Sequence, residues 1–392
     1  MIVREILKEE KKRTDELFAI AFEQPMPKES EPDASEHCWA AFTDEGDMMS
    51  SIMISDYNMN LDGKACRAGG VGAVESLPQY RRRGGIRACF ENALPWMYKN
   101  NYAFSYLFPF SSAYYRKFGY ENCAQRLEVS VNLGLLKPEN TDGHFVLAEK
   151  NNGMGKYIKA LDRLCERRYN TMVIHDESDY AWTEYFRPAE TLEFCYVYFS
   201  RDNTAKAYTV FRMQQQNDGR NLVCSKFCFA DREGFSGLMN LFKSLASDHS
   251  YVKFQLPAEP ELLFMLPEWK MGAVSWAPAE AGMIRAVNVI SCLEAAKYRG
   301  SGKLTLKIND TQIAENNHCF MLEFENGKAV NACPTELPPD AEMDISVFST
   351  LIAGSCDFSV VKNCFSSLRI FNTAAPFENV FYKKPMMINE YF

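Results

Sequence analysis

The sequence predicts a mixed α/β (α+β) protein that consists of a repeated unit followed by a third, smaller domain. The chain has 392 residues, which corresponds to two to three domains of ordinary size. Strands and helices follow one another in a similar order in the first two parts of the chain. In the last hundred residues, short alternating strands and short helices replace this order. We therefore expect three domains, at residues 1–136, 137–282 and 283–392.

The first part reads as one compact unit of strands and helices. A loop at 24–36, rich in proline, is expected to be a flexible or lid-like segment. The other expected elements are a strand at 2–4, a helix at 8–22, strands at 38–44, 48–57 and 64–77, a helix ending near 99, a strand at 102–110, a short tyrosine-rich helix and a strand at 127–133.

The second part begins after a linker at 137–143 and repeats the sequence of strands, helix and strand. Its expected elements are a helix at 155–168, strands at 191–200, 205–214 and 221–229, a helix at 235–246 and a strand at 251–256. The third part is expected to hold a strand at 283–289, a helix at 292–298, strands at 303–308, 319–324 and 328–332, and helices at 345–353 and 357–363.

Composition and charge restrict the classes of function. The chain carries 43 Lys and Arg against 51 Asp and Glu, a net charge of −8. An acidic surface disfavours nucleic-acid binding, which depends on basic residues that displace counterions. It can also raise the local concentration of a cationic small molecule. No apolar stretch of about 18 residues occurs, so we expect no contact with a membrane interior.

The cysteines and histidines indicate a cytoplasmic protein without a metal site. The 13 cysteines are dispersed, and the first residues, MIVREILKEEKKR, lack the apolar core of a signal peptide. We therefore expect reduced thiols, most of them buried. The five histidines are scattered without the spacing of paired ligands, so no metal is expected.

The segment VGAVESLPQYRRRGGIR, residues 71–87, carries the clearest chemical signal. A strand runs into a turn whose backbone is freed by Gly84 and Gly85, and a helix begins at once. Helix N-termini bind phosphates because they present unpaired N–H groups and a positive dipole end. Arginine side chains add charge-assisted contacts. The spacing is neither GxxxxGK[ST] nor GxGxxG, so the expected ligand is a pyrophosphate outside the P-loop and dinucleotide classes.

A solvated basic turn is the alternative interpretation of Arg81, Arg82 and Arg83. The helix that follows favours the phosphate site, because it has a continuous apolar face that would anchor it. That face is formed by Ile86, Phe90, Ala93, Leu94 and Met97. Pro95 interrupts the helical pattern and predicts a kink or an early end there.

This segment resembles the acetyl-CoA signature of the GNAT superfamily of N-acetyltransferases. In the family pattern, Arg/Gln-x-x-Gly-x-Gly/Ala, Arg81 and Gly84 match, whereas Ile86 replaces the last small residue. With this departure and in the plan of its domains, the whole chain resembles the enhanced intracellular survival (Eis) family of acetyltransferases. The resemblance implies tandem GNAT acyltransferase domains, the second degenerate, followed by a sterol-carrier-protein-like α+β domain. It also implies a homo-hexamer.

The resemblance further implies which residues hold acetyl-CoA. Val74, Glu75 and Ser76 would pair with the pantetheine arm through their backbone, and Phe110 and Ser111 would line the thioester end. The pyrophosphate would lie on a loop and helix start formed by Arg82, Arg83, Gly84, Gly85, Ile86 and Arg87.

A second motif, YYRKFGY at residues 114–120, resembles the short helix from which GNAT enzymes protonate the departing thiolate. Tyr115 stands five residues before Tyr120, as the family's acid does. A phenol with a pKa near 10 suits a thiolate whose conjugate acid has a pKa near 8.5. We expect Tyr115 to be the acid and Tyr114 and Tyr120 to be core residues.

The base that must deprotonate the amine is harder to find, since neither motif contains histidine. The Eis resemblance implies that the C-terminal carboxylate, here on Phe392, reaches the first domain. An ordinary α-carboxyl has a pKa near 3.5, so burial or a water relay would have to assist it. Glu23 and Glu390 are candidates for binding the positive charge of the substrate, with solvated surface acids as the alternative.

The predicted function is transfer of an acetyl group from acetyl-CoA to primary amines of a polycationic small molecule (aminoglycoside or polyamine-like) or to lysine. The corresponding loop of the second domain has one arginine, and Asp231 and Glu233 would repel a pyrophosphate, so only the first domain should bind the coenzyme. The alternatives are a non-catalytic lipid- or acyl-CoA-binding protein and a sensor of acetyl-CoA.

Overall fold

The computed structural model describes the whole chain except residues 27–34, 124, 218, 267 and 392. It divides into two compact units. The first unit comprises Met1–Ala124, Gly282–Lys384 and Ile388–Phe392, and the second comprises Gln125–Ala281 and Pro385–Met387. The expected division into three domains, with limits after residues 136 and 282, stays a prediction.

The first sheet lies in the first unit and has the strand order β1-β2-β3-β4-β5-β15-β6. Strands β2, β3 and β4 form an antiparallel meander, and β4 pairs with β5 in parallel. The elements are β1 (Ile2–Glu5), α1 (Lys11–Phe22), β2 (Glu36–Phe42), β3 (Met48–Leu61), β4 (Lys64–Ser76), α2 (Gly85–Lys99), β5 (Phe104–Leu107), α3 (Ser112–Tyr115), β6 (Glu121–Asn122) and β15 (Met283–Ala286).

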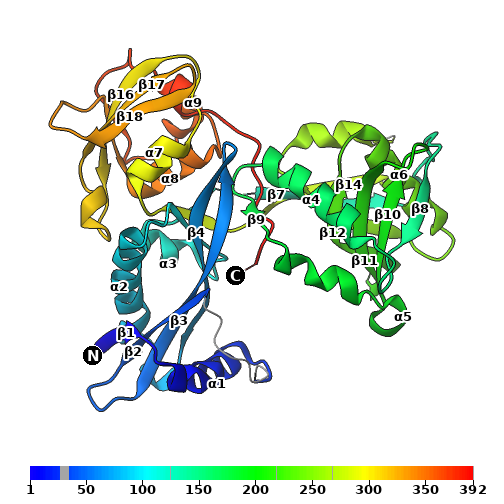
Figure 1. Ribbon diagram of the computed structural model, residues 1–392, viewed down its shortest axis with the longest axis horizontal. Coiled ribbons are helices and arrows are strands. Elements are labelled where there is room, and N and C mark those ends of the chain that lie inside the picture. Colours follow the sequence, from blue (N-terminus) through cyan, green and yellow to red (C-terminus); the bar gives the residue numbers. More distant parts are fainter. Residues whose placement is uncertain (27–34, 124, 218, 267, 392) are drawn as a thin grey trace. The chain divides into compact units, whose positions relative to one another are not determined.

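Helices α1 and α2 cover opposite faces of this sheet (Figure 1). Leu17 of α1 packs with Ala40, whereas Phe90 of α2 packs with Ala41, the next residue of β2. Successive strand residues point to opposite faces, so β2 contributes to both cores. Most of the predicted lid at 24–36 falls outside the described residues.

The helix α2 continues through Pro95 to Lys99. The sequence predicted a kink or an early end at this proline, and the early end is wrong. A proline removes one hydrogen bond of the helix, but Ala93, Leu94 and Met97 around it are buried against the sheet. This packing outweighs the loss.

Two strands belong to different sheets from those expected from their positions in the sequence. Strand β7 (Gln125–Asn132), expected in the first domain, pairs with β13 (Tyr251–Pro257) and β14 (Val274–Glu280) in the second unit. Strand β15, expected in the third domain, lies between β5 and β6 in the first sheet. The chain thus completes the first sheet only after it has passed through the second unit.

The second unit is built on a sheet of order β14-β7-β13-β12-β11-β10-β8. Its buried core joins Phe211, Phe235 and Phe242 to strand β7 through Val129 and Val131. The other strands and α-helices of this part of the chain are β8 (His144–Leu147), α4 (Gly155–Arg168), β9 (Val173–Ile174), α5 (Pro188–Thr191), β10 (Glu193–Phe199), β11 (Ala205–Gln216), β12 (Gly219–Phe229) and α6 (Arg232–Ser244).

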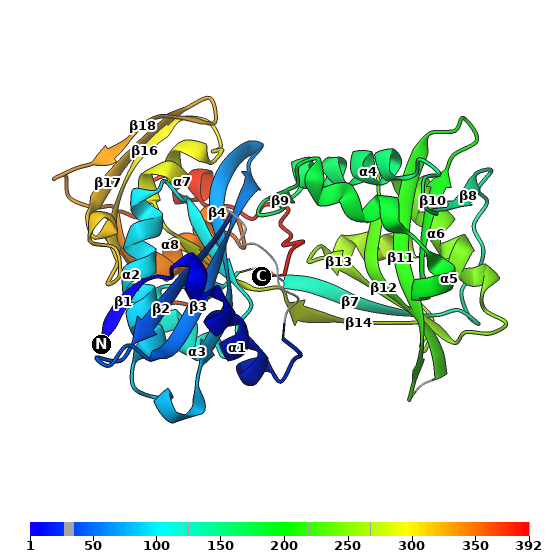
Figure 2. The ribbon, with the colours of Figure 1, turned by 60° about the horizontal axis from the view of Figure 1, so that its bottom comes forward.

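The last part of the first unit forms a third sheet, of order β18-β17-β16-β19-β20 (Figure 2). Its apolar helix α8 packs on β15 and β16. The elements are α7 (Val289–Ala295), β16 (Gly302–Asn309), β17 (Cys319–Glu325), β18 (Lys328–Pro334), β19 (Ala341–Asp344), α8 (Ile345–Ala353), α9 (Phe358–Val361), β20 (Arg369–Ile370) and α10 (Phe377–Val380).

Two buried ion pairs join this third sheet and its helices to the first sheet. Arg285 of β15 binds both carboxylate oxygens of Asp310 at 2.8 Å, and neither side chain is exposed. Lys384 pairs with Asp62 in the turn between β3 and β4. No helix in the described part of the chain is long and apolar enough to cross a membrane.

Candidate active site

Strand β4 carries a bulge beside the site. Ser51 pairs with Glu75 and Met53 with Gly72, so Ile52 of β3 faces two residues of β4, Ala73 and Val74. Ala73 accordingly adopts a left-handed φ of 44°. The pairing of β4 with β5 ends at Val71. From Gly72 to Ser76, β4 therefore has no strand on its β5 side among the described residues.

The loop after β4 presents its backbone to this open edge. Arg82 and Gly84 adopt left-handed φ angles of 63° and 86°. The first backbone hydrogen bond of α2 runs from the N–H of Ala88 to the carbonyl of Gly84 at 3.0 Å. The N–H groups before Ala88 therefore precede the hydrogen-bond ladder of the helix, which is the arrangement that binds anions.

Gly85 is required for space and not for backbone conformation. A Cβ atom at this position would lie 2.5 Å from Ser50 Oγ and 2.9 Å from Ser50 Cβ. The start of α2 therefore rests directly on β3, where Ser50 Oγ also lies 2.7 Å from Ser76 Oγ. This contact fixes the helix N-terminus above the end of β4.

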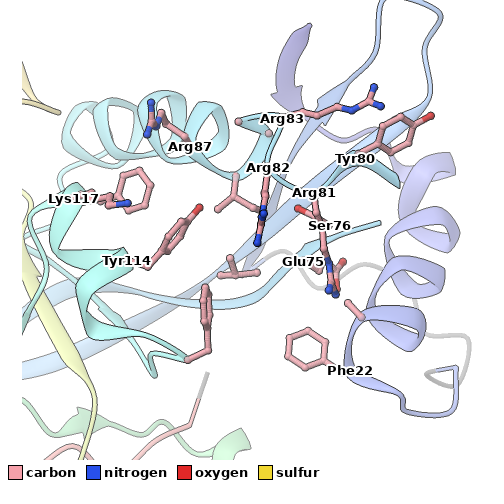
Figure 3. Close-up of a pocket in the computed structure, with 17 residues that line it drawn as sticks. Phe22, Glu75, Ser76, Tyr80, Arg81, Arg82, Arg83, Arg87, Tyr114 and Lys117 are labelled. Atoms are coloured by element: carbon pink, nitrogen blue, oxygen red, sulfur yellow. The ribbon is translucent and has the colours of Figure 1, made fainter. Parts of the chain in front are cut away.

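The loop and the strand edge open into a cavity of about 840 Å³ (Figure 3). Cationic side chains occupy one part of its lining: Arg81, Arg82, Arg83, Arg87 and Lys117. Apolar groups of Ala21, Phe22, Val74 and Phe110 line another part. The cavity thus offers a binding region for an anion and an apolar region within one continuous volume.

The YYRKFGY motif lies beside this cavity. Tyr114 of α3 lines it, whereas Tyr115 is only 2% exposed and packs behind the wall, with its ring 5.3 Å from that of Phe110. Burial raises the pKa of Tyr115. Tyr120 lies deeper, with its hydroxyl 2.6 Å from Ser105 Oγ.

Three family models match the chain. Residues 3–123 and residues 172–286 each match an acetyltransferase (GNAT) domain, and residues 289–364 match a sterol carrier protein domain. The chain thus carries two GNAT acetyltransferase domains in tandem. No curated protein matches the sequence.

Several solved structures share the fold of the whole chain. One is a probable N-acyltransferase from Enterococcus faecalis, with a TM-score of 0.85 and 20% identity, and coverage of 100% of this chain and 99% of that one. A GCN5-related N-acetyltransferase from Anabaena variabilis has a TM-score of 0.85 at 17% identity, with both chains covered fully. Eis1 from Mycobacterium abscessus has a TM-score of 0.80 at 16% identity, again with full coverage of both chains.

In the first GNAT domain, most of the residues expected at the coenzyme site line the same cavity. These are Val74, Glu75, Ser76, Arg82, Arg83, Gly84, Gly85, Ile86, Arg87 and Phe110. Ser111 stands apart as the N-cap residue of α3, where its carbonyl accepts the N–H of Tyr114 at 3.0 Å.

Among the described residues, those expected to act as the base or to bind the acceptor do not lie together at the cavity. Phe392 lies outside the described residues. The tail before it returns to the first unit, where Tyr391 stacks on Phe108 with a centroid distance of 4.4 Å. Glu23 is exposed at the end of α1 with a φ of 53°, and Glu390 is half-buried in the tail.

The sequence did not identify the wall that α1 supplies, nor Tyr80, Tyr114 and Lys117. Ala21 and Phe22 come from a helix about fifty residues earlier, so spacing around the loop could not reveal them. Lys117 does belong to the YYRKFGY motif, and its charge was an available signal. The side chain of Glu75 was also missed, because only its backbone was expected to act.

In the second GNAT domain, a side-chain carboxylate already binds an N–H group at the start of α6. Asp231 caps the helix by accepting the N–H of Gly234 at 3.0 Å and pairs with Lys206 at 2.7 Å. Gly234 cannot carry a side chain, since a Cβ would lie 2.3 Å from the Lys206 carbonyl. A carboxylate thus stands where the first domain has open N–H groups.

Proposed function

We propose that the first GNAT domain transfers the acetyl group of acetyl-CoA to a primary amine of a small cationic molecule, of the polyamine or aminoglycoside kind, or to lysine. The single observation that carries this proposal is the continuous cavity that runs from the arginine loop along the open edge of β4 to Tyr114 of α3. The small cationic acceptor is consistent with the net charge of −8.

The residues around the cavity fit the chemical groups of acetyl-CoA. The N–H groups at the start of α2, together with Arg82, Arg83 and Arg87, suit a pyrophosphate. The unpaired edge of β4 from Gly72 to Ser76 suits an extended amide-bearing arm, because it offers backbone donors and acceptors. The coenzyme, when bound, would supply an activated acetyl thioester.

Tyr115 is proposed to act as the acid that protonates the leaving sulfur. Its burial and the position of its ring directly behind Phe110 support this role. Burial keeps the phenol protonated, since it raises the pKa. Tyr114 is the competing tyrosine, because it lines the cavity itself.

The test is release of free thiol from acetyl-CoA with spermidine, an aminoglycoside and a lysine peptide as acceptors. Tyr115→Phe should lower kcat by about 100-fold and leave acetyl-CoA binding intact. Tyr114→Phe is the matched variant, and we expect a smaller effect from it. A larger loss in Tyr114→Phe would move the role to that residue. Absence of turnover in the parent enzyme would favour a binding or sensing protein.

The homo-hexamer and the cytoplasmic location implied by the resemblance and composition stay predictions. Light scattering on the purified protein would test the first, because a hexamer has six times the 44.8 kDa mass of the chain.

A further inference from the structure

The charges around the cavity are unequally distributed. Five cationic side chains line it, and among the lining residues that the structure describes, Glu75 is the one acid. The cations suit an anionic coenzyme. An acceptor that arrives as an ammonium ion needs an anion in the same cavity, and Glu75 is the group available to it.

Glu75 is buried and has an oxygen without a partner. The residue is 3% exposed, and its Oε1 accepts a hydrogen bond from Ser51 Oγ at 2.7 Å. Its Oε2 has no hydrogen-bond partner among the described residues. Leaving a buried carboxylate oxygen unpaired is costly, so such a group indicates a missing donor.

The bulge in β4 determines which wall of the cavity this carboxyl occupies. Glu75 stands two residues after Ala73, at the open edge of the strand. Val74 packs with the core beneath α2, so its neighbour Glu75 points to the opposite face, which α1 covers. Figure 3 shows Glu75 on the side of the cavity nearest Phe22 of α1.

We propose that Glu75 binds the ammonium group of the acceptor through Oε2 and takes up its proton. This inference rests on the proposed acetyl transfer. One proton passes from nitrogen to Glu75, and the amine nitrogen then bonds to the acetyl carbon. The carbon–sulfur bond breaks, and Tyr115 gives its proton to sulfur and regains one from the nitrogen. Glu75 releases its proton to solvent, so the products are the amide, the free thiol and one proton.

The environment of Glu75 suits proton exchange with an amine. Burial raises its pKa to about 8, against a smaller lowering by the Ser51 hydrogen bond. The titratable groups around it are Asp15 of α1, which raises the pKa further, and the Cys38 thiol of β2. An alkylammonium group has a pKa near 10.4. A carboxylate whose pKa is about 8 therefore takes the proton of the ammonium group at a much lower free-energy cost than an ordinary carboxylate does.

The experiment compares Glu75→Gln with the parent enzyme, using acetyl-CoA and spermidine between pH 6 and 9.5. The amide keeps the size of the side chain but cannot accept the proton. We expect kcat/KM for spermidine to fall about 100-fold, with acetyl-CoA affinity unchanged within twofold. Ser51→Ala should move the limb of the parent profile near pH 8 to higher pH, because it removes the hydrogen bond that favours the charged form.

Glu91→Gln is the control, since Glu91 lies exposed on α2 outside the cavity lining. Parent-like kcat/KM and pH profile in Glu75→Gln, in an active parent, would overturn the role of Glu75 and leave the acetyl transfer standing. If the parent shows no turnover, the proposed function fails, and calorimetry with spermidine and coenzyme A decides on Glu75. If Glu75→Gln binds spermidine at least tenfold more weakly than the parent, the proposal that Glu75 binds the ammonium group stands. If both proteins bind spermidine equally, or neither binds it, that proposal is rejected.

Discussion

At the scale of single residues, the buried carboxyl of Glu75 connects stability to pH. Its pKa is raised to about 8 by burial, whereas in the unfolded chain it would titrate near 4.3. Between these values the folded protein holds a proton that the unfolded chain has released. The contribution of Glu75 to the free energy of unfolding is therefore expected to fall as the pH rises from about 5 to 8.

We expect Glu75→Gln to remove this part of the pH dependence. The difference in the free energy of unfolding, variant minus parent, should increase by on the order of 2 kcal/mol from pH 5 to pH 8. Urea denaturation at several pH values measures the difference. The free energy of unfolding of Glu91→Gln should change with pH in the same way as that of the parent. A Glu75→Gln curve that also runs parallel would show that the carboxyl is not shifted.

At the scale of elements, the contact between α2 and β3 decides the geometry of the phosphate loop. In Gly85→Ala, the new Cβ would meet Ser50 Oγ at 2.5 Å, so the start of α2 must move away from β3. We expect a loss of about 1–3 kcal/mol of stability and weaker acetyl-CoA binding, measured by denaturation and calorimetry.

The partner residue supplies the control for that substitution. Ser50→Gly removes both atoms that the new Cβ would meet, so Gly85→Ala should cost less in this background. Gly84→Ala meets no atom within 4 Å but retains a φ of 86°, which tests backbone strain separately. Equal costs of Gly85→Ala in both backgrounds would mean that steric contact with Ser50 does not fix the helix.

How far the sequence predicts an element depends on where its determinants lie. The arginine loop and the start of α2 were predictable because strand, glycines and helix are adjacent in the chain. The role of Glu75 was not, since it depends on a bulge at Ala73 and on Ser51, which lies on a neighbouring strand. Strand periodicity likewise predicts that 127–133 and 283–289 are strands, but it does not say which sheet receives them.

At the scale of the whole molecule, the Arg285–Asp310 pair attaches the sterol carrier protein domain to the catalytic sheet. Asp310 also accepts hydrogen bonds from the N–H of Gln312 at 2.9 Å and from Asn316 Nδ2 at 3.0 Å. Burial raises the pKa of the Tyr120 phenol to about 12, against lowering by the Ser105 hydrogen bond and by the nearby charge of Arg285. The pair therefore supports the sheet behind the tyrosine motif.

We expect Asp310→Asn to destabilise the first unit strongly. The substitution leaves the guanidinium of Arg285 buried without its counter-ion, which costs about 3–5 kcal/mol. Urea denaturation followed by intrinsic fluorescence measures it. Glu342→Gln is the comparison, because its pair with Arg369 at 3.7 Å is partly exposed and should contribute under about 1 kcal/mol. A similar small loss in both variants would contradict the proposed attachment.

The place of β15 in the first sheet has a consequence for synthesis on the ribosome. Strands β5 and β6 emerge early, but the strand that joins them emerges only after Gln125–Ala281, nearly all of the second unit, has been translated. Until then the nascent chain carries two unpaired strand edges, which are prone to pair wrongly. The catalytic domain should thus finish folding after the second unit, although its sequence comes first.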